Sequence, residues 1–394
     1  MKWLVPENEL DRDQRDSIKS LSQNKSNRWV EGFPGSGKTV LLLYAAKNIC
    51  VNEPKASIVF IEFTHSLINM VEAAIHELRS GNNFQEIPVQ TYYEFCKGTE
   101  SYDYILCDEV QDLPDRVLSA MHRRAKKQVF VAGDLNQSIY LDDPQFHDPT
   151  CSPEAIGSLL NIPRRDTLHV IHRLTPTIIK AVNAFMPGMN ILQGRYSMMK
   201  NDTQIRVWKA SNQTLEADSI MKEALDSVKV DNSVGILFRH HINIENFVNT
   251  YLKYQRKPIW KYQTNKYGRP DYFLMNRHLA SLGIPMQYVG NGYGTFKSDE
   301  SKITLMTYHS AKGIDFDKVF LPFKNASSDS ISDSEKTLLM VAMTRSRQDL
   351  YISYTTLLDS NVHSFLNLCK FTDLENPNTG TLFGTNNDNK DEFA

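Results

Sequence analysis

The sequence predicts an α/β protein with two tandem parallel-sheet domains. Apolar runs of strand length alternate with stretches of helical period along nearly the whole chain, a pattern typical of parallel strands joined by helices. The alternation stops at residues 141–153, which have the composition of a loop, and then starts again. With 394 residues, of which 41% are apolar and 23% charged, the chain is long enough for two compact domains.

The expected elements follow the chain in order. In the first half, apolar runs predict strands at residues 28–30, 57–62, 104–107 and 128–132, and helical periodicity predicts helices at residues 38–51, 66–79 and 114–124. In the second half we place strands at residues 168–171, 205–209, 234–238, 303–306, 319–321 and 350–353. The predicted domains are therefore residues 1–165 and 166–371. Residues 372–394, rich in Asn, Asp, Gly and Thr, are predicted to be a disordered tail.

Composition and charge exclude several classes of protein. A net charge of −2 at pH 7 excludes a chain that coats nucleic acid through bulk positive charge, although it leaves room for a local basic groove. The five cysteines are scattered and form no CxxC pair, so we expect neither a disulfide framework nor a zinc site. This use of cysteine fits a protein of the reducing cytosol. No apolar run approaches the roughly 20 residues of a membrane span, and charged residues soon follow the N-terminus. We therefore expect no signal peptide and a soluble cytoplasmic protein.

A glycine-rich stretch at residues 32–39 matches the GxxxxGK[ST] pattern of a phosphate-binding loop. It follows an expected strand and precedes the apolar helix at residues 40–46. The glycines allow the backbone to curl so that successive N–H groups face phosphate oxygens, with a helix N-terminus behind them. Lys38 is then placed to reach the β- and γ-phosphates, and Thr39 to hold Mg²⁺.

A second element of nucleotide chemistry is the apolar strand at residues 104–107, which is followed by Asp108 and Glu109. At the carboxyl end of a strand in such a sheet, Asp108 can hold Mg²⁺ while Glu109 orients and deprotonates the attacking water. Together the loop and the two acids predict hydrolysis of a nucleoside triphosphate, a property that many families share.

The residues after this strand narrow the choice among these families. Residues 108–112 are DEVQD, and DExQD is characteristic of superfamily 1 helicases of the UvrD/Rep type, which the chain resembles. Further segments resemble the motifs of this family, in the family's order: Gln14, FTHS at 63–66, QTYYEF at 90–95, GDLNQSIY at 133–140, HRLT at 172–175, TYHSAKGIDF at 307–316 and VAMTRSR at 341–347. The chain contains no NKxD guanine signature, whereas the upstream glutamine suits adenine.

This resemblance implies two RecA-like domains with ATP bound in the cleft between them. It implies that the nucleotide and Mg²⁺ are held by Gln14, Gly35, Ser36, Gly37, Lys38, Thr39, Asp108, His172, Gly313 and Asp315. It implies that hydrolysis depends on Lys38, Glu109, the γ-phosphate sensor Gln137, and two arginines of the second domain, Arg173 and Arg345. It also implies single-strand contacts by Thr64, His65, Tyr92, Tyr140, Thr307 and His309.

The chain departs from the family pattern at three places. His172 stands where the family usually has a tyrosine that stacks on adenine, and Asp315 stands where a glutamate usually reaches the ribose. Leu141, Asp142 and Asp143 occupy the place of an aromatic residue and an arginine that grip single-strand bases. Because one stacked base is worth about 1–3 kcal/mol, we expect a weaker grip on a single strand.

Both large accessory insertions of the family, known as 1B and 2B, are missing. The place of the second is taken by a short insert at residues 240–300, in which basic and aromatic residues interleave, among them Lys253, Arg256, Lys257 and Trp260. Such a segment suits the binding of a nucleic-acid single strand, because basic side chains neutralise phosphates and aromatic rings stack on bases. The same pattern fits a helix with a buried aromatic face, or a surface that docks a partner, and the sequence leaves these interpretations open.

Two functions agree with these features. The first is an ATP-dependent DNA helicase or translocase, whose ATPase is stimulated by single-stranded DNA and which moves 3′ to 5′. The second is an ATP-binding regulatory or DNA-sensing subunit of a nuclease-containing complex, as in bacterial anti-phage defence, with little unwinding of its own. The complete hydrolytic set favours the first function, and the missing insertions and stacking residues favour the second.

Overall fold

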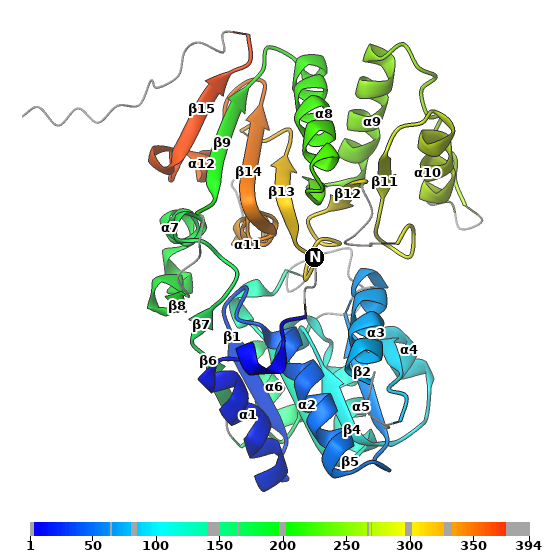
Figure 1. The fold of residues 1–394 in the computed structure, drawn as a ribbon, viewed down its shortest axis with the longest axis vertical. Helices are drawn as coiled ribbons and strands as arrows, with labels where there is room; N and C mark the ends of the chain where they lie inside the picture. The colour runs from blue at the N-terminus through cyan, green and yellow to red at the C-terminus, as the bar shows by residue number, and fades with distance from the viewer. Residues whose placement is uncertain are drawn as a thin grey trace, which may run out of the picture.

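The computed structural model describes residues 4–63, 65–79, 85–139, 150–163, 165–196, 202–265, 268, 270–295, 302–326 and 333–375, without the side chains of residues 21, 22, 65 and 66. These residues form two α/β domains that stand one above the other in Figure 1, with the N-terminal domain below. Each domain has its own parallel sheet with helices on both faces. The predicted fold class is therefore confirmed.

The sheet of the first domain has the strand order β3-β2-β4-β5-β1-β6, and its described pairings are all parallel. The strands are β1 (Arg28–Gly32), β2 (Ile58–Glu62), β3 (Val89–Thr91), β4 (Tyr102–Cys107), β5 (Ala125–Gly133) and β6 (Arg165–Leu168). Because β6 pairs with β1, this sheet extends past the predicted domain boundary at residue 165. The single strand expected at 168–171 is divided between β6 and β7 (Val170–Ile171).

Helices cover both faces of this sheet. They are α1 (Arg12–Gln23), α2 (Lys38–Asn52), α3 (His65–Arg79), α4 (Tyr92–Lys97), α5 (Asp115–Arg124) and α6 (Pro153–Leu159), with 3₁₀ turns η1 (Glu7–Glu9), η2 (Val110–Asp112) and η3 (Leu135–Gln137). The face that bears Phe60 and Leu106 packs against α2 and α3, and the opposite face packs against α4, α5 and α6. This alternation determines which way the polar residues after each strand point.

The second domain has a larger sheet, in the order β11-β12-β10-β13-β14-β9-β15, again parallel in every described pairing. Its strands are β9 (Gln204–Lys209), β10 (Val234–Phe238), β11 (Met286–Tyr288), β12 (Ile303–Thr307), β13 (Phe316–Leu321), β14 (Ser346–Tyr354) and β15 (Cys369–Asp373). Thr372 and Asp373 thus lie in a strand and not in the predicted tail. The tail from residue 376 onward lies outside the described residues.

The helices of the second domain are α7 (Pro176–Phe185), α8 (Gln213–Lys229), α9 (His241–Tyr254), α10 (Tyr272–Ser281), α11 (Asp333–Met343) and α12 (Ser360–His363). Short 3₁₀ turns are η4 (Pro187–Met189), η5 (Ile191–Gln193) and η6 (Leu366–Leu368). A small pair, β7 with β8 (Arg195–Tyr196), lies beside α7 at one side of the molecule in Figure 1. One apolar cluster, which includes Val131 of β5 and Leu350 of β14, is continuous from the first domain to the second.

The insert between β10 and β12 has an apolar core of its own, formed by α9, α10 and the chain between them. Trp260 is only 3% exposed and packs beside Tyr272, and its backbone is held by two hydrogen bonds with the side chain of Asn249 on α9. The prediction that Trp260 contacts nucleic acid is therefore wrong, because its ring is part of the core. Tyr254 and Tyr262 remain more than half exposed.

Two of the exclusions drawn from composition can be examined in the described residues. No described helix combines the length and apolar character needed to cross a membrane. The five cysteines are all free thiols, and Cys107 on β4 is fully buried.

We predict that Trp260→Ala lowers the free energy of unfolding by about 3–5 kcal/mol, since it removes a large buried ring. The neighbouring Tyr262→Ala is the matched control, because that ring is 55% exposed and its loss should cost only about 0.5 kcal/mol. Urea denaturation of the full chain measures both. Equal losses for the two variants would contradict the assignment of Trp260 to the core.

Candidate nucleotide-binding site

The phosphate loop lies between β1 and α2, in the conformation that its glycines permit. Gly35 and Gly37 have positive φ angles of 74° and 81°, and Gly37 is the residue that precedes the first turn of α2. The Nζ of Lys38 donates to the carbonyl oxygens of Gly32 and Phe33, at 2.8 and 3.3 Å. The lysine is thus folded back over its own loop, at the position from which it can reach a phosphate.

The two residues expected to hold Mg²⁺ are in direct contact. The Thr39 hydroxyl donates to Asp108 Oδ2 at 2.5 Å, although 69 positions separate them in the sequence. The other oxygen of Asp108 accepts the Glu109 N–H at 2.9 Å. A hydroxyl and a carboxylate at the N-terminus of a helix, beside a loop shaped for phosphate, are oxygen donors suited to Mg²⁺, which takes few protein ligands and keeps substrate oxygens and waters. The residues present therefore fit the ion.

Glu109 is a buried carboxylate held between cations. Its backbone is left-handed, with φ at 52°, which turns the side chain out of the strand direction of β4. Gln111 Nε2 donates to Glu109 Oε2 at 2.6 Å, and Lys312 Nζ lies 3.4 Å from the same oxygen. Burial raises the pKa of Glu109, but the charges of Lys312 and Lys38 outweigh it and leave the pKa below its ordinary value. Glu109 is therefore ionised at neutral pH, as a group that orients and accepts a proton from water must be.

Lys312 is the residue of this site that the sequence analysis did not assign. It comes from the segment between β12 and β13 of the second domain, is 1% exposed, and forms a buried ion pair with Asp112 of the first domain. It also donates to the Gln137 carbonyl at 2.7 Å. Burial lowers the pKa of Lys312, but Asp112 and Glu109 outweigh it and raise the pKa, so the lysine stays charged. The sequence did contain a signal for this residue, because Lys312 lies within the TYHSAKGIDF segment at 307–316, which resembles a motif of the family.

A hydrogen-bond network links Glu109 to the predicted γ-phosphate sensor. Gln111 accepts the Asp134 N–H at 3.1 Å through its side-chain oxygen, and Asp134 in turn accepts the Gln137 side-chain amide at 2.8 Å. Because Lys312 contacts the Gln137 carbonyl and Glu109, the network closes through the second domain. A change at Gln137 is thus placed to affect both Glu109 and the contact between domains.

The two arginines expected at the γ-phosphate lie together, around one acid. Arg173 Nη1 donates to Asp315 Oδ2 at 2.8 Å, and Arg345 Nη1 lies 3.9 Å from Asp315 Oδ1. Arg345 is 2% exposed and also donates to the Val341 carbonyl and to Thr344 Oγ1. Burial lowers the pKa of Arg345 to about 10, with a further contribution from the charge of Arg173. Asp315 therefore holds two like charges in one place.

Arg173 and its neighbour pack directly on the phosphate loop. The His172 N–H donates to the Gly35 carbonyl at 2.9 Å, and a Cβ added at Gly35 would approach the Arg173 Cβ to 2.8 Å. Gln14 donates through Nε2 to the Ser36 carbonyl at 3.2 Å, so it borders the loop from α1. The His172 ring bonds Asp11, the capping residue of α1, at 2.6 Å. The predicted adenine contacts, Gln14 and His172, thus meet at the N-terminus of α1.

The predicted nucleic-acid contacts are only partly brought together. Tyr92 is half-buried and its ring stacks on Phe63 at 5.2 Å between centroids, whereas the next residue, Tyr93, is 56% exposed. Thr307 is buried and holds the turn at Ser310, and His309 is half-buried. Thr64, Tyr140, Leu141, Asp142, Asp143 and the side chain of His65 lie outside the described residues.

The basic residues of the insert differ in exposure. Lys253 and Arg256 are exposed, at and just after the end of α9, and Lys261 is exposed beyond them. Lys257 is half-buried, and its Nζ donates to the Leu282 carbonyl at 2.8 Å. The residues from 253 to 265 include no acid. Three of the four cations thus lie outside the core that holds Trp260.

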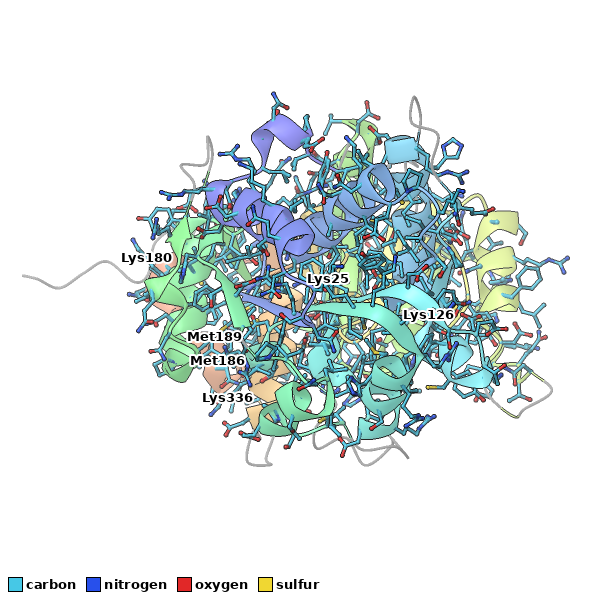
Figure 2. All side chains as sticks on the ribbon, turned by 90° about the horizontal axis from the view of Figure 1, so that it is seen from below. Lys25, Lys126, Lys180, Met186, Met189 and Lys336 are labelled. Carbon is cyan, nitrogen blue, oxygen red and sulfur yellow. The ribbon has the colours of Figure 1, made fainter. Side chains whose placement is uncertain are left out.

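A cavity of about 410 Å³ lies beside the motif around Gln137. Asn136 and Ser138 line it from the first domain, and Phe185, Met186, Met189 and Lys336 line it from α7, η4 and α11 of the second. Figure 2 shows Met186, Met189 and Lys336 grouped at one side of the molecule. The two domains therefore touch at Lys312, and residues of both also line this cavity.

Two family models match the chain. A model for an AAA domain matches residues 14–143, and a model for the UvrD-like helicase C-terminal domain matches residues 284–356. The first match spans the phosphate loop, the DExQD residues and Gln137, and the second spans Lys312, Asp315 and Arg345. The resemblance to UvrD-like helicases is therefore confirmed. The comparison with curated proteins gives no match.

Solved structures of helicases are similar to the chain at low identity. One is the helicase nonstructural protein 10 of an arterivirus in complex with DNA, with 15% identity and a TM-score of 0.43, over 86% of this chain and 62% of that chain. Another is from a structure of two Pif1 helicases at forked double-stranded DNA, with 13% identity and a TM-score of 0.47, over 90% of this chain and 94% of that chain. The chain thus spans less than two thirds of the arterivirus protein.

We predict that Lys312→Ala lowers the free energy of unfolding by about 3–5 kcal/mol, because it leaves Asp112 and Glu109 buried without their cation. The control is Lys336→Ala, which removes an ion pair to Asp333 at 3.0 Å near the surface and should cost less than about 1 kcal/mol. Urea denaturation at pH 7 measures both values. A loss below about 1 kcal/mol for Lys312→Ala would show that the bridge between the domains is not stabilising.

Proposed function

Since an AAA-domain model and a UvrD-like helicase C-terminal model match its two halves, we propose that the chain is an ATP-dependent motor on single-stranded DNA, moving 3′ to 5′. The observation that carries this proposal is the junction of the two domains at one site. Lys312 of the second domain contacts Glu109 and the Gln137 carbonyl of the first. Asp315 holds Arg173 and Arg345, and Arg173 packs on Gly35 of the phosphate loop. A nucleotide bound there touches both domains, so its hydrolysis changes their contact.

In this proposal the first domain binds ATP and Mg²⁺. The loop N–H groups and Lys38 bind the β- and γ-phosphates, Gln14 reads the adenine edge, and Thr39 and Asp108 hold the metal ion. When bound, Mg²⁺ would neutralise negative charge on the phosphate oxygens. Lys38 must exchange the carbonyls of Gly32 and Phe33 for phosphate oxygens, which are stronger acceptors.

Hydrolysis uses groups from both domains. Glu109 orients the attacking water and takes its proton, and its low pKa keeps it in the ionised form this step requires. Arg173 and Arg345 stabilise the charge that develops on the transferred phosphoryl group, with Asp315 holding them in place. Gln137 senses the γ-phosphate and passes the change through its contact with Lys312.

Contacts with single-stranded DNA are assigned to both domains. The proposed contacts with the DNA strand remain Thr64, His65, Tyr92, Tyr140, Thr307 and His309. Lys253, Arg256 and Lys257 extend this surface along the insert by binding phosphates, without the ring of Trp260. A role as a regulatory or DNA-sensing subunit beside a nuclease stays a prediction that the structure does not test.

We predict that the ATPase rate of the purified chain rises when single-stranded DNA is added. Glu109→Gln should abolish hydrolysis yet still bind nucleotide, because it removes the base and keeps Asp108, whereas Lys38→Ala should also weaken nucleotide binding. Steady-state phosphate release and binding of a fluorescent ATP analogue measure these effects. Wild-type turnover in either variant would contradict the proposed site, and a rate unaffected by DNA would contradict the motor.

We predict that removing the insert's cations weakens single-strand binding and flattens its salt dependence. Each phosphate that a cation no longer neutralises should reduce the log–log salt slope by about 0.7, so replacing Lys253, Arg256, Lys257 and Lys261 with Gln should lower it by up to roughly 3. The DNA-free ATPase rate is the internal control and should not change. If affinity and slope are both unchanged, the insert binds no DNA and serves as a core or as a docking face for protein.

A further inference from the structure

Glu62 is a buried carboxylate that the mechanism above does not use. It is the last residue of β2, is 0% exposed, and neither of its carboxylate oxygens has a hydrogen-bond partner among the residues that the structure describes. Burying an ionisable group without partners is costly, so such a side chain calls for an explanation.

The register of the sheet places Glu62 beside Asp108. Ile58 pairs with Tyr104 and Phe60 with Leu106, and the Asp108 N–H donates to the Ile61 carbonyl at 3.1 Å. Continuing this register puts Glu62 opposite Asp108. Phe60 and Leu106 both face α2, and side chains alternate along a strand, so Glu62 and Asp108 point to that same face. This is the face on which Thr39, at the start of α2, meets Asp108.

Electrostatics agrees with this placement. Burial raises the pKa of Glu62 well above its ordinary value, and the charges of Asp108 and Glu109 raise it further, against a weaker opposing effect of the adjacent Phe63 N–H. Both oxygens of Asp108 are already occupied by Thr39 and by the Glu109 N–H. Glu62 thus presents two acceptors that have no described partner at this corner of the site.

We propose that Glu62 is an outer carboxylate of the metal site, which accepts hydrogen bonds from water molecules on the Mg²⁺ held by Thr39 and Asp108. The inference rests on the proposed function. Glu62 is assigned a contact through water because Mg²⁺ takes few protein ligands, and Thr39 and Asp108 already supply two oxygens. Mg²⁺ keeps several of its waters, and groups beyond the direct ligands commonly orient them.

A purely structural role makes a different prediction about metal binding. If Glu62 only filled the core, a neutral or apolar residue of similar size would relieve an unpartnered carboxylate and leave metal binding unchanged. If Glu62 serves the metal site, the same substitution still relieves that cost, but it weakens metal binding. Stability and metal affinity together therefore separate the two roles.

The experiment measures Mn²⁺ binding to the ADP complex of the full chain by electron paramagnetic resonance, beside the thermal unfolding midpoint. Glu62→Gln keeps the shape and removes the charge, and Glu62→Leu removes both acceptors. The matched control is Glu216→Gln in the second domain, whose carboxylate is also 0% exposed but accepts hydrogen bonds from Ser353 and Phe323. Asp108→Asn is the positive control.

We expect both Glu62 variants to bind Mn²⁺ about tenfold more weakly, with unfolding midpoints no lower than wild type. Glu216→Gln should leave Mn²⁺ affinity unchanged. Wild-type Mn²⁺ affinity in both Glu62 variants would overturn the inference, and so would a lowered midpoint together with unchanged affinity. If the wild-type chain itself bound no Mn²⁺ with ADP, the proposed nucleotide site would fail, which is a distinct result from failure at Glu62 alone.

Discussion

The buried charge of Lys312 is the interaction on which the rest of the site depends. An ammonium group at 1% exposure is stable only beside carboxylates, and both of its acids, Asp112 and Glu109, belong to the other domain. The ion pair therefore fixes how the segment after β12 approaches the first sheet. Asp315, three residues further on, binds Arg173 and lies 3.9 Å from Arg345, and Arg173 packs on Gly35 of the phosphate loop. The continuous apolar cluster holds the domains together, and the charges set where they meet.

Much of the first domain could be predicted because its chemistry is local. A phosphate loop needs a strand before it and a helix after it, and Asp108 ends a strand of the same parallel sheet, so the two must meet at its carboxyl edge. The contact between Thr39 and Asp108 confirms this expectation. The approximate strands were also predictable from apolar runs, whereas β3, β6 and β15 lie at sheet edges and have short or partly exposed sequences.

What could not be predicted depends on contacts between distant residues. Lys312 and Asp112 are 200 positions apart, and although each lies in a motif of the resembled family, neither motif indicates that the two side chains pair. An aromatic ring among lysines suits a base or a core equally well, and only the packing of Trp260 between α9 and α10 separates the two. Likewise, Glu62 has the sequence of an ordinary polar strand end. The role proposed for Glu62 depends on the neighbouring strand β4, whose register places Asp108 beside it.

The central claim is that the second domain completes the hydrolytic site. Steady-state ATPase kinetics of Arg345→Ala tests it most directly, with Arg347→Ala as the control, because Arg347 pairs with Asp317 inside the second domain at 3.2 Å. If Arg345 acts on charge that develops in the transition state, its loss should lower kcat by about 10³-fold with little change in KM. The control should keep kcat near the wild-type value. A raised KM with unchanged kcat in Arg345→Ala would contradict the claim, since the arginine would then only help ATP to bind.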